Sequence, residues 1–194
     1  MTVMPPNVSS GLPISGSPLL TYDEFVERFA DRRAELVCGV VEELPLPKFP
    51  HGWLAATLTR LLGNHVAEHD AGWVVSHDTF VRVKRDPDTV RGPDVAFYSY
   101  ATLPKGPVPK DPKDIIPELV IEVKSPSDSS SKLNSKVGEY LVAGVKIVLV
   151  IDPDTQTATI YRGEAIHETL HLQDTLTLPD LLPRFELPLA KIFG

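Results

Sequence analysis

The sequence predicts an α/β domain in which part of a central sheet is parallel. Residues 119–124 and 146–151 are two strand-like apolar segments, and the apolar positions of 133–144 between them recur at helical spacing. A strand, a helix and a second strand at this spacing form a crossover, which joins parallel strands. A chain of 194 residues with 42% apolar and 23% charged residues suits one globular domain. We expect that domain at residues 21–194, after a flexible tail at residues 1–20 in which proline and glycine interrupt each apolar run.

The elements before the crossover follow from local signals. Thr21 and Glu24 have the spacing of a capping box, which predicts a helix starting there. A hairpin with arms at 36–37 and 40–44 comes next. Apolar residues at helical spacing then predict an amphipathic helix over 51–68.

Three strands are expected after that helix, at residues 73–76, 79–84 and 94–98. The segment from 104 to 117 holds five prolines, so we expect a loop there rather than a helix or a central strand. After the crossover, alternation predicts one more strand at 157–162, and the remaining residues are expected to form short turns.

Composition excludes several classes of protein. No apolar run approaches the roughly 18 residues of a membrane span, and the first 20 residues lack the pattern of a signal peptide. The lone Cys38 cannot form an internal disulfide, so a cytoplasmic location is the simplest expectation.

The net negative charge argues against tight binding of nucleic acid through general attraction to phosphate. Nineteen Lys and Arg residues stand against 26 Asp and Glu residues, which gives a formal net charge of −7. Proteins that hold nucleic acid through phosphate neutralisation are usually basic. A site that gathers carboxylates around a metal ion is compatible with this acidity.

The residues that indicate chemistry lie on two predicted strands. Alternation places Glu122 and Lys124 on one face of their strand, and Asp94 begins an earlier strand. If the two strands are neighbours, Asp94 and Glu122 can share a divalent ion. Mg²⁺ is usually held by one or two carboxylates, waters and a substrate phosphate, and a nearby lysine can stabilise developing negative charge. The set therefore suits metal-dependent hydrolysis of a phosphodiester.

A purely structural interpretation also exists for each part of this set. A Glu-x-Lys tripeptide is common by chance, and Glu122 and Lys124 could form an ion pair on a half-exposed strand face. The Pro93-Asp94 pair could simply enter a turn. Charges inside a buried strand are costly, however, and this favours a function for Glu122.

Read together, several segments resemble the Uma2 family, a group of restriction-endonuclease-like proteins in the PD-(D/E)XK superfamily. The resemblance runs from about Thr21 to Phe193 and keeps the segments in order. Its most specific part is E-V-K-S-P-S-D, followed by K-x-x-E-Y-x-x-A-G-V and an apolar strand that ends in Asp-Pro. The segments that carry it are TYDEFVERF, AELVCGVVEELP, HGWLAATLTRLLGNHV, RGPDVAFYS, PELVIEVKSPSD, KVGEYLVAGVKIVLVIDPD and LPDLLPRFELPLAKIF.

The resemblance implies a restriction endonuclease-like fold, with a central mixed sheet flanked by helices, and a role for seven residues. Asp94 and Glu122 would bind the metal together with the backbone carbonyl of Val123, and Lys124 would be the catalytic lysine. Glu35 would lie at the edge of the site. His51 and Lys136 match a recurrent histidine and a recurrent lysine of the family.

The chain departs from the family pattern at two places. Cys38 and Val40 stand where the family tends to have polar residues, and Gly92 separates Arg91 from the Pro-Asp pair. These departures bear on substrate contacts rather than on the central set.

The function expected from these observations is a Mg²⁺-dependent endonuclease that acts on DNA, with Mn²⁺ as a possible substitute. A homodimer is expected because cutting both strands of a duplex is simplest with two sites. Two alternatives stay open. One is a catalytically silent nuclease fold that serves binding or assembly, and the other is a metal-dependent phosphodiesterase for RNA or a small substrate.

Overall fold

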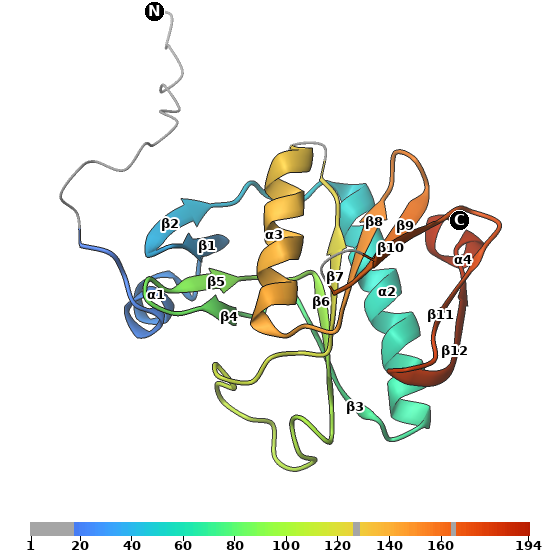
Figure 1. The fold of residues 1–194 in the computed structure, drawn as a ribbon, viewed down its shortest axis with the longest axis horizontal. Helices are drawn as coiled ribbons and strands as arrows, with labels where there is room; N and C mark the ends of the chain where they lie inside the picture. The colour runs from blue at the N-terminus through green and yellow to red at the C-terminus, as the bar shows by residue number, and fades with distance from the viewer. Residues whose placement is uncertain (1–17, 126–128, 164–165) are drawn as a thin grey trace, which may run out of the picture.

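A central six-stranded sheet with helices on both faces organises the protein (Figure 1). The computed structural model describes residues 18–125, 129–163 and 166–194. The expected tail at 1–20 lies almost wholly outside them, as does part of the polar loop before the second long helix. The helices are α1 (Tyr22–Phe29), α2 (Phe49–Glu68), α3 (Ser130–Ala143) and α4 (Ala190–Phe193).

The central sheet is mixed, with the strand order β10-β9-β8-β7-β6-β3. Only β7 and β8 run parallel in it, and α3 connects them, so the predicted crossover is confirmed. All other neighbours in this sheet are antiparallel. Its strands are β3 (Gly72–Ser76), β6 (Val95–Ser99), β7 (Leu119–Val123), β8 (Ile147–Asp152), β9 (Thr157–Arg162) and β10 (Ile166–Leu170).

A smaller sheet of order β2-β1-β5-β4 lies beside α1 (Figure 1). Its strands are β1 (Ala34–Val37), β2 (Val40–Glu43), β4 (Val81–Lys84) and β5 (Thr89–Arg91). The predicted hairpin is confirmed as β1 and β2. Its two turn residues, Cys38 and Gly39, have φ values of 49° and 78°, as a two-residue hairpin turn of the primed type requires.

Two expectations about the strands were wrong. The turn after β4 is followed by β5, a strand that the sequence did not predict because it is only three residues long. The C-terminal segment forms β10, a two-stranded sheet of β11 (Thr175–Leu178) and β12 (Leu182–Pro188), and α4 rather than turns alone. Leu176 and Leu178 alternate with exposed threonines, and they pack into the main core.

Two apolar clusters lie on opposite faces of the central sheet. On one face α2 packs Leu54, Leu58 and Leu62 against β6, β7 and the C-terminal strands. On the other face α3 packs Val137 and Tyr140 against the opposite side chains of the same strands. The alternation within β7 is therefore as predicted, with Ile121 and Val123 facing α2 and Val120 facing α3.

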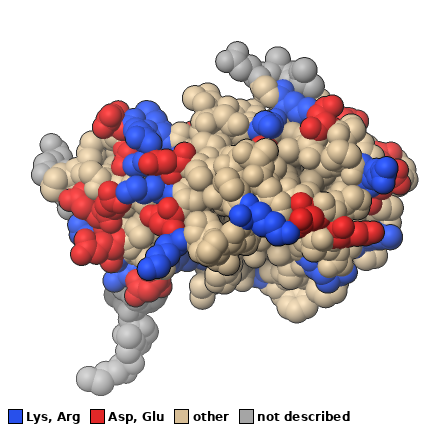
Figure 2. Space-filling model, turned by 90° about the horizontal axis from the view of Figure 1, so that it is seen from below, with Lys and Arg blue, Asp and Glu red and all other residues tan. Residues whose placement is uncertain are grey.

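Charged side chains of both signs are interspersed over the face drawn in Figure 2, next to a broad area of uncharged residues. No continuous basic stripe is visible on that face. Among the described residues, none of the helices combines the length and the hydropathy that a bilayer span needs.

Candidate active site

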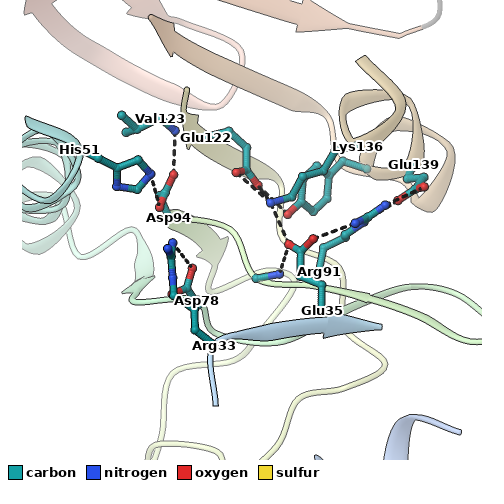
Figure 3. A network of polar contacts seen from close by, with 12 residues as sticks. Arg33, Glu35, His51, Asp78, Arg91, Asp94, Glu122, Val123, Lys136 and Glu139 are labelled. Atoms are coloured by element: carbon teal, nitrogen blue, oxygen red, sulfur yellow. Dashed lines mark hydrogen bonds and ion pairs between the residues drawn. The ribbon is translucent and has the colours of Figure 1, made fainter. Parts of the chain in front are cut away.

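Asp94 lies directly before β6, at the point where this strand meets β7. The Val123 backbone N–H donates to Asp94 Oδ2 at 2.7 Å, and His51 Nε2 lies 3.3 Å from Oδ1 (Figure 3). His51 is in the first turn of α2, and its hydrogen bond to Asp94 raises the pKa of the imidazole. Both side chains are buried. A strand and a helix thus fix the Asp94 carboxylate from two sides.

Glu122 is the buried carboxylate of β7. Tyr140 Oη donates to Glu122 Oε1 at 2.8 Å, and Lys136 Nζ lies 2.9 Å from the same oxygen. Burial raises the pKa of Glu122 to about 7, and the nearby Lys136 ammonium offsets only part of this rise. The β6–β7 register pairs Val95 with Ile121, so its continuation by one residue sets Asp94 opposite Glu122. One predicted metal ligand therefore lies in β7 and the other directly before its neighbour β6.

Glu35 of β1 lies on the other side of the same ammonium. Lys136 Nζ is 2.8 Å from Glu35 Oε1, and Arg91 Nη1 donates to Oε2 at 2.7 Å. The Gly92 N–H donates to Oε1 at 3.0 Å. Burial alone would raise the pKa of Glu35, but the two cations and this N–H hold it below its ordinary value. Arg91 also makes two contacts with Glu139 of α3, at 2.7 and 3.0 Å.

The geometry of β7 also bears on the Val123 carbonyl. In a strand the N–H and C=O of one residue point to the same side, and the Val123 N–H points toward Asp94. Continued by two residues, the β6–β7 register sets Pro93 opposite Val123. Proline has no N–H, so this neighbour cannot donate to the Val123 carbonyl. The Val123 backbone oxygen is thereby directed to the side of β7 on which Asp94 lies.

Lys124 departs from the expected arrangement. Its Nζ lies 2.6 Å from Asp152 Oδ2 at the end of β8, because the parallel register that pairs Val123 with Ile151 brings Asp152 next to it. Lys124 is also not among the residues that line the cavity described below. The lysine found between the site carboxylates is Lys136.

A cavity of about 420 Å³ opens onto these groups. Seven carboxylate side chains and four Lys or Arg side chains line it, so the cavity favours a cation. The lining includes six of the predicted residues, namely Glu35, His51, Asp94, Glu122, Val123 and Lys136.

A family model matches most of the chain. The model of the Uma2 family, described as "Putative restriction endonuclease", matches residues 21–190. The chain belongs to the Uma2 family.

A solved structure has a similar fold. A structure described as a "putative nuclease belonging to DUF820 from Anabaena variabilis" matches with a TM-score of 0.77 and 20% identity, over 90% of this chain and 97% of that one. At this identity the likeness shows the fold alone. A search of the curated proteins found no match.

The oxygen atoms at the cavity of this Uma2 protein can be compared with the ligands that a divalent cation prefers. In the part of the chain that the structure describes, no three His, Cys, Asp or Glu side chains are grouped to hold a metal. Mg²⁺ does not require such a group, since it commonly binds one or two carboxylates and completes its shell with water and phosphate. Asp94, Glu122 and the Val123 carbonyl supply hard oxygen donors at one cavity, so they fit a hard cation.

Sequence reasoning missed three residues that shape this site. Arg91 donates to Glu35, Glu139 holds Arg91, and Tyr140 donates to Glu122. Tyr140 is one of the positions between 133 and 144 whose apolar spacing predicts the helix, and its ring does pack in the core. A possible signal was the hydroxyl itself, because a buried tyrosine usually needs a polar partner.

Proposed function

We propose that this Uma2 protein is a Mg²⁺-dependent endonuclease that hydrolyses phosphodiester bonds of DNA, with Mn²⁺ as an alternative ion. The observation that carries the proposal is the convergence of Asp94, Glu122 and the Val123 backbone on one acidic cavity. Membership of a restriction endonuclease family supports nucleic acid as the substrate. When bound, the ion would polarise the scissile phosphate and make a water molecule more acidic.

The protein's own groups prepare the site for that ion. The Val123 N–H and His51 orient Asp94, and Tyr140 and Lys136 orient Glu122. Because these partners are fixed by β7, α2 and α3, the carboxylates are held in place before substrate arrives. In the reaction, a water molecule gives up one proton as its oxygen forms a bond to phosphorus. The bond from phosphorus to the sugar oxygen breaks, and this leaving oxygen takes up one proton.

Two lysines compete for the role of assisting the attacking water. Lys124 is the one that the family pattern implies, and we propose it for this step, which would require its ammonium to leave Asp152. Lys136 already contacts Glu122. Replacement of Lys124 by alanine should lower kcat far more than it changes the affinity for Mn²⁺, because the proposal gives Lys124 a part in the chemical step and gives metal binding to Asp94, Glu122 and the Val123 carbonyl.

Plasmid cleavage tests the proposal. Supercoiled DNA is incubated with Mg²⁺ and wild type, Asp94→Asn, Glu122→Gln or Lys124→Ala, and with Glu186→Gln as a control for an exposed carboxylate of β12. We expect wild type and the control to cut, and loss of either metal-binding carboxylate to slow cutting by roughly 100-fold or more. Equal cleavage by all five proteins would assign the activity to a contaminant and remove the site assignment.

A silent nuclease fold is the second candidate function. The observation in its favour is that the Lys136 ammonium already forms ion pairs with both Glu35 and Glu122. Calorimetric titration with Mn²⁺ separates the two functions, because a wild type that binds no Mn²⁺ supports the silent fold. A panel of duplex DNA, single-stranded DNA, RNA and a chromogenic phosphodiester then identifies the substrate class of an active protein.

A further inference from the structure

A second, larger cavity adjoins the candidate active site. Its volume is about 820 Å³, and it lies along the side of α2 that faces β3 and the loop before β1. Five residues line both cavities, namely Arg33, Pro47, His51, Asp78 and Asp94. A substrate held at Asp94 can therefore continue directly into the second cavity.

The two cavities differ in charge. The first is lined by seven carboxylates and four Lys or Arg side chains, whereas the second has three of each. In the second cavity Arg33 is held by Asp78 at 2.9 Å. Arg32 makes a long exposed contact of 3.5 Å with Glu43, and its guanidinium carbon lies 5.6 Å from the centre of the Phe29 ring. Arg60 is exposed and has no recorded ion pair with any described residue. The second cavity thus suits a phosphate chain better than the first does.

Large apolar side chains are exposed beside this cavity. The exposed fractions are 84% for Phe49 and 57% for Trp53, both on α2, and 85% for Leu46 in the segment before it. Phe49, Trp53 and Arg60 are spaced by four and seven residues, so they lie along one face of α2. Leu46 and Arg60 themselves line the cavity, which places the two aromatic rings along its rim.

We infer that this face of α2 is a binding platform for unpaired nucleic acid, in which the second cavity takes the sugar-phosphate chain and Phe49 and Trp53 stack on bases. The inference rests on the proposed function, because it assumes that the strand leads to Asp94. Exposed aromatic rings bind bases through their faces. A base in a duplex is already stacked on both faces, so these rings select a single strand over a duplex.

Binding is measured without cleavage, in EDTA, so that the result does not depend on catalysis. The chain has two tryptophans, and Trp73→Phe leaves Trp53 as the only reporter. Trp73 lies in β3 and donates to the Leu103 carbonyl, outside both cavities. Single-stranded DNA and RNA oligonucleotides and a duplex of equal length are titrated. We expect single strands to quench Trp53 fluorescence and to bind at least about tenfold tighter than the duplex.

Variants locate the binding surface by anisotropy of a labelled oligonucleotide. Phe49→Ala, Trp53→Ala and Arg60→Ala should each weaken single-strand binding, by about tenfold for each ring. Val142→Ala, which trims an exposed apolar residue of α3, and Arg85→Ala, which removes an exposed arginine outside both cavities, should bind like wild type. Thermal melting checks that each variant is folded.

The outcomes separate this inference from the proposed function. If the wild type cleaves plasmid and the three α2 variants bind single strands like the wild type, the binding platform is overturned and the proposed nuclease is not. Single-strand binding that depends on these residues, without cleavage, supports the platform and overturns the nuclease. If Phe49→Ala and Trp53→Ala instead change the oligomeric state in light scattering and leave oligonucleotide binding unchanged, the rings form a protein interface and the platform is overturned.

Discussion

Lys136 is the residue on which the charge balance of the site depends. Its ammonium lies between Glu35 and Glu122, and although burial disfavours its charge, these two carboxylates raise its pKa above the ordinary value. Lys136→Met should lower the free energy of unfolding by about 3 kcal/mol, because a buried carboxylate loses its partner. The same change should tighten Mn²⁺ binding by about tenfold, because a positive charge beside a proposed ligand is removed. Urea unfolding and calorimetry measure the two effects.

Lys132→Met is the matched control for Lys136→Met. Lys132 lies one helical turn earlier, lines the same cavity and is largely exposed, with a long 3.5 Å contact to Glu42. It should change neither stability nor Mn²⁺ affinity by much. Weaker Mn²⁺ binding in Lys136→Met would contradict the electrostatic argument. It would indicate that Lys136 arranges the ligands rather than competing with the ion.

Local patterns were sufficient for some site residues and insufficient for others. Asp94 and Glu122 could be found because a carboxylate at a strand end and another inside an apolar strand are visible in a short window of sequence. The contact of Lys124 with Asp152 joins residues 28 positions apart and depends on the register of two parallel strands. Arg91 and Glu35 are 56 positions apart. Such pairs are set by strand order, which a single sequence does not state.

At the scale of elements, β3 and β6 approach each other closely where Gly72 pairs with Ser99. Gly72 permits this approach, since a Cβ atom added there would lie 2.1 Å from the Tyr98 carbonyl oxygen and 2.7 Å from the Phe97 ring. Gly72→Ala should therefore lower the free energy of unfolding by roughly 2–3 kcal/mol, as overpacking does. Gly63→Ala, at an α2 position where a Cβ meets no atom within 4 Å, should stabilise by about 0.5–1 kcal/mol. Denaturant unfolding should give changes of opposite sign in the free energy of unfolding for the two variants. An unchanged free energy in Gly72→Ala would contradict the close approach.

The elements that the sequence predicted are those with a strong local period or cap. The Thr21 capping box is formed, with the Glu24 carboxylate accepting from the Thr21 N–H at 2.9 Å. The crossover of β7, α3 and β8 follows from long apolar patterns and from Gly144, whose φ of 108° ends α3. Short strands such as β5 gain their stability from Leu36 and other partners across the sheet. Their three or four residues carry too little period to be found in isolation.

At the scale of the whole molecule, the net charge of −7 sets how nucleic acid can be held. A chain with this charge gains little from general attraction to phosphate, so affinity has to come from a local surface. If that surface holds one strand, a single active site is enough for one cut. The need to cut two strands then no longer supports a homodimer. The homodimer stays a prediction, and light scattering tests it.

Salt dependence gives the sharpest test of such local binding. The second cavity offers at most three arginines, and one of these is held by Asp78. For a single strand, the slope of log K against log salt is about −0.7 for each neutralised phosphate, so we expect a slope of about −2 or shallower between low and moderate salt. Arg60→Ala should make the slope shallower by about 0.7, whereas Trp53→Ala should weaken binding at every salt concentration without changing the slope, because stacking releases no counterions. A wild-type slope of about −4 or steeper would mean that the strand contacts cations outside this cavity, and the path along α2 would then be wrong.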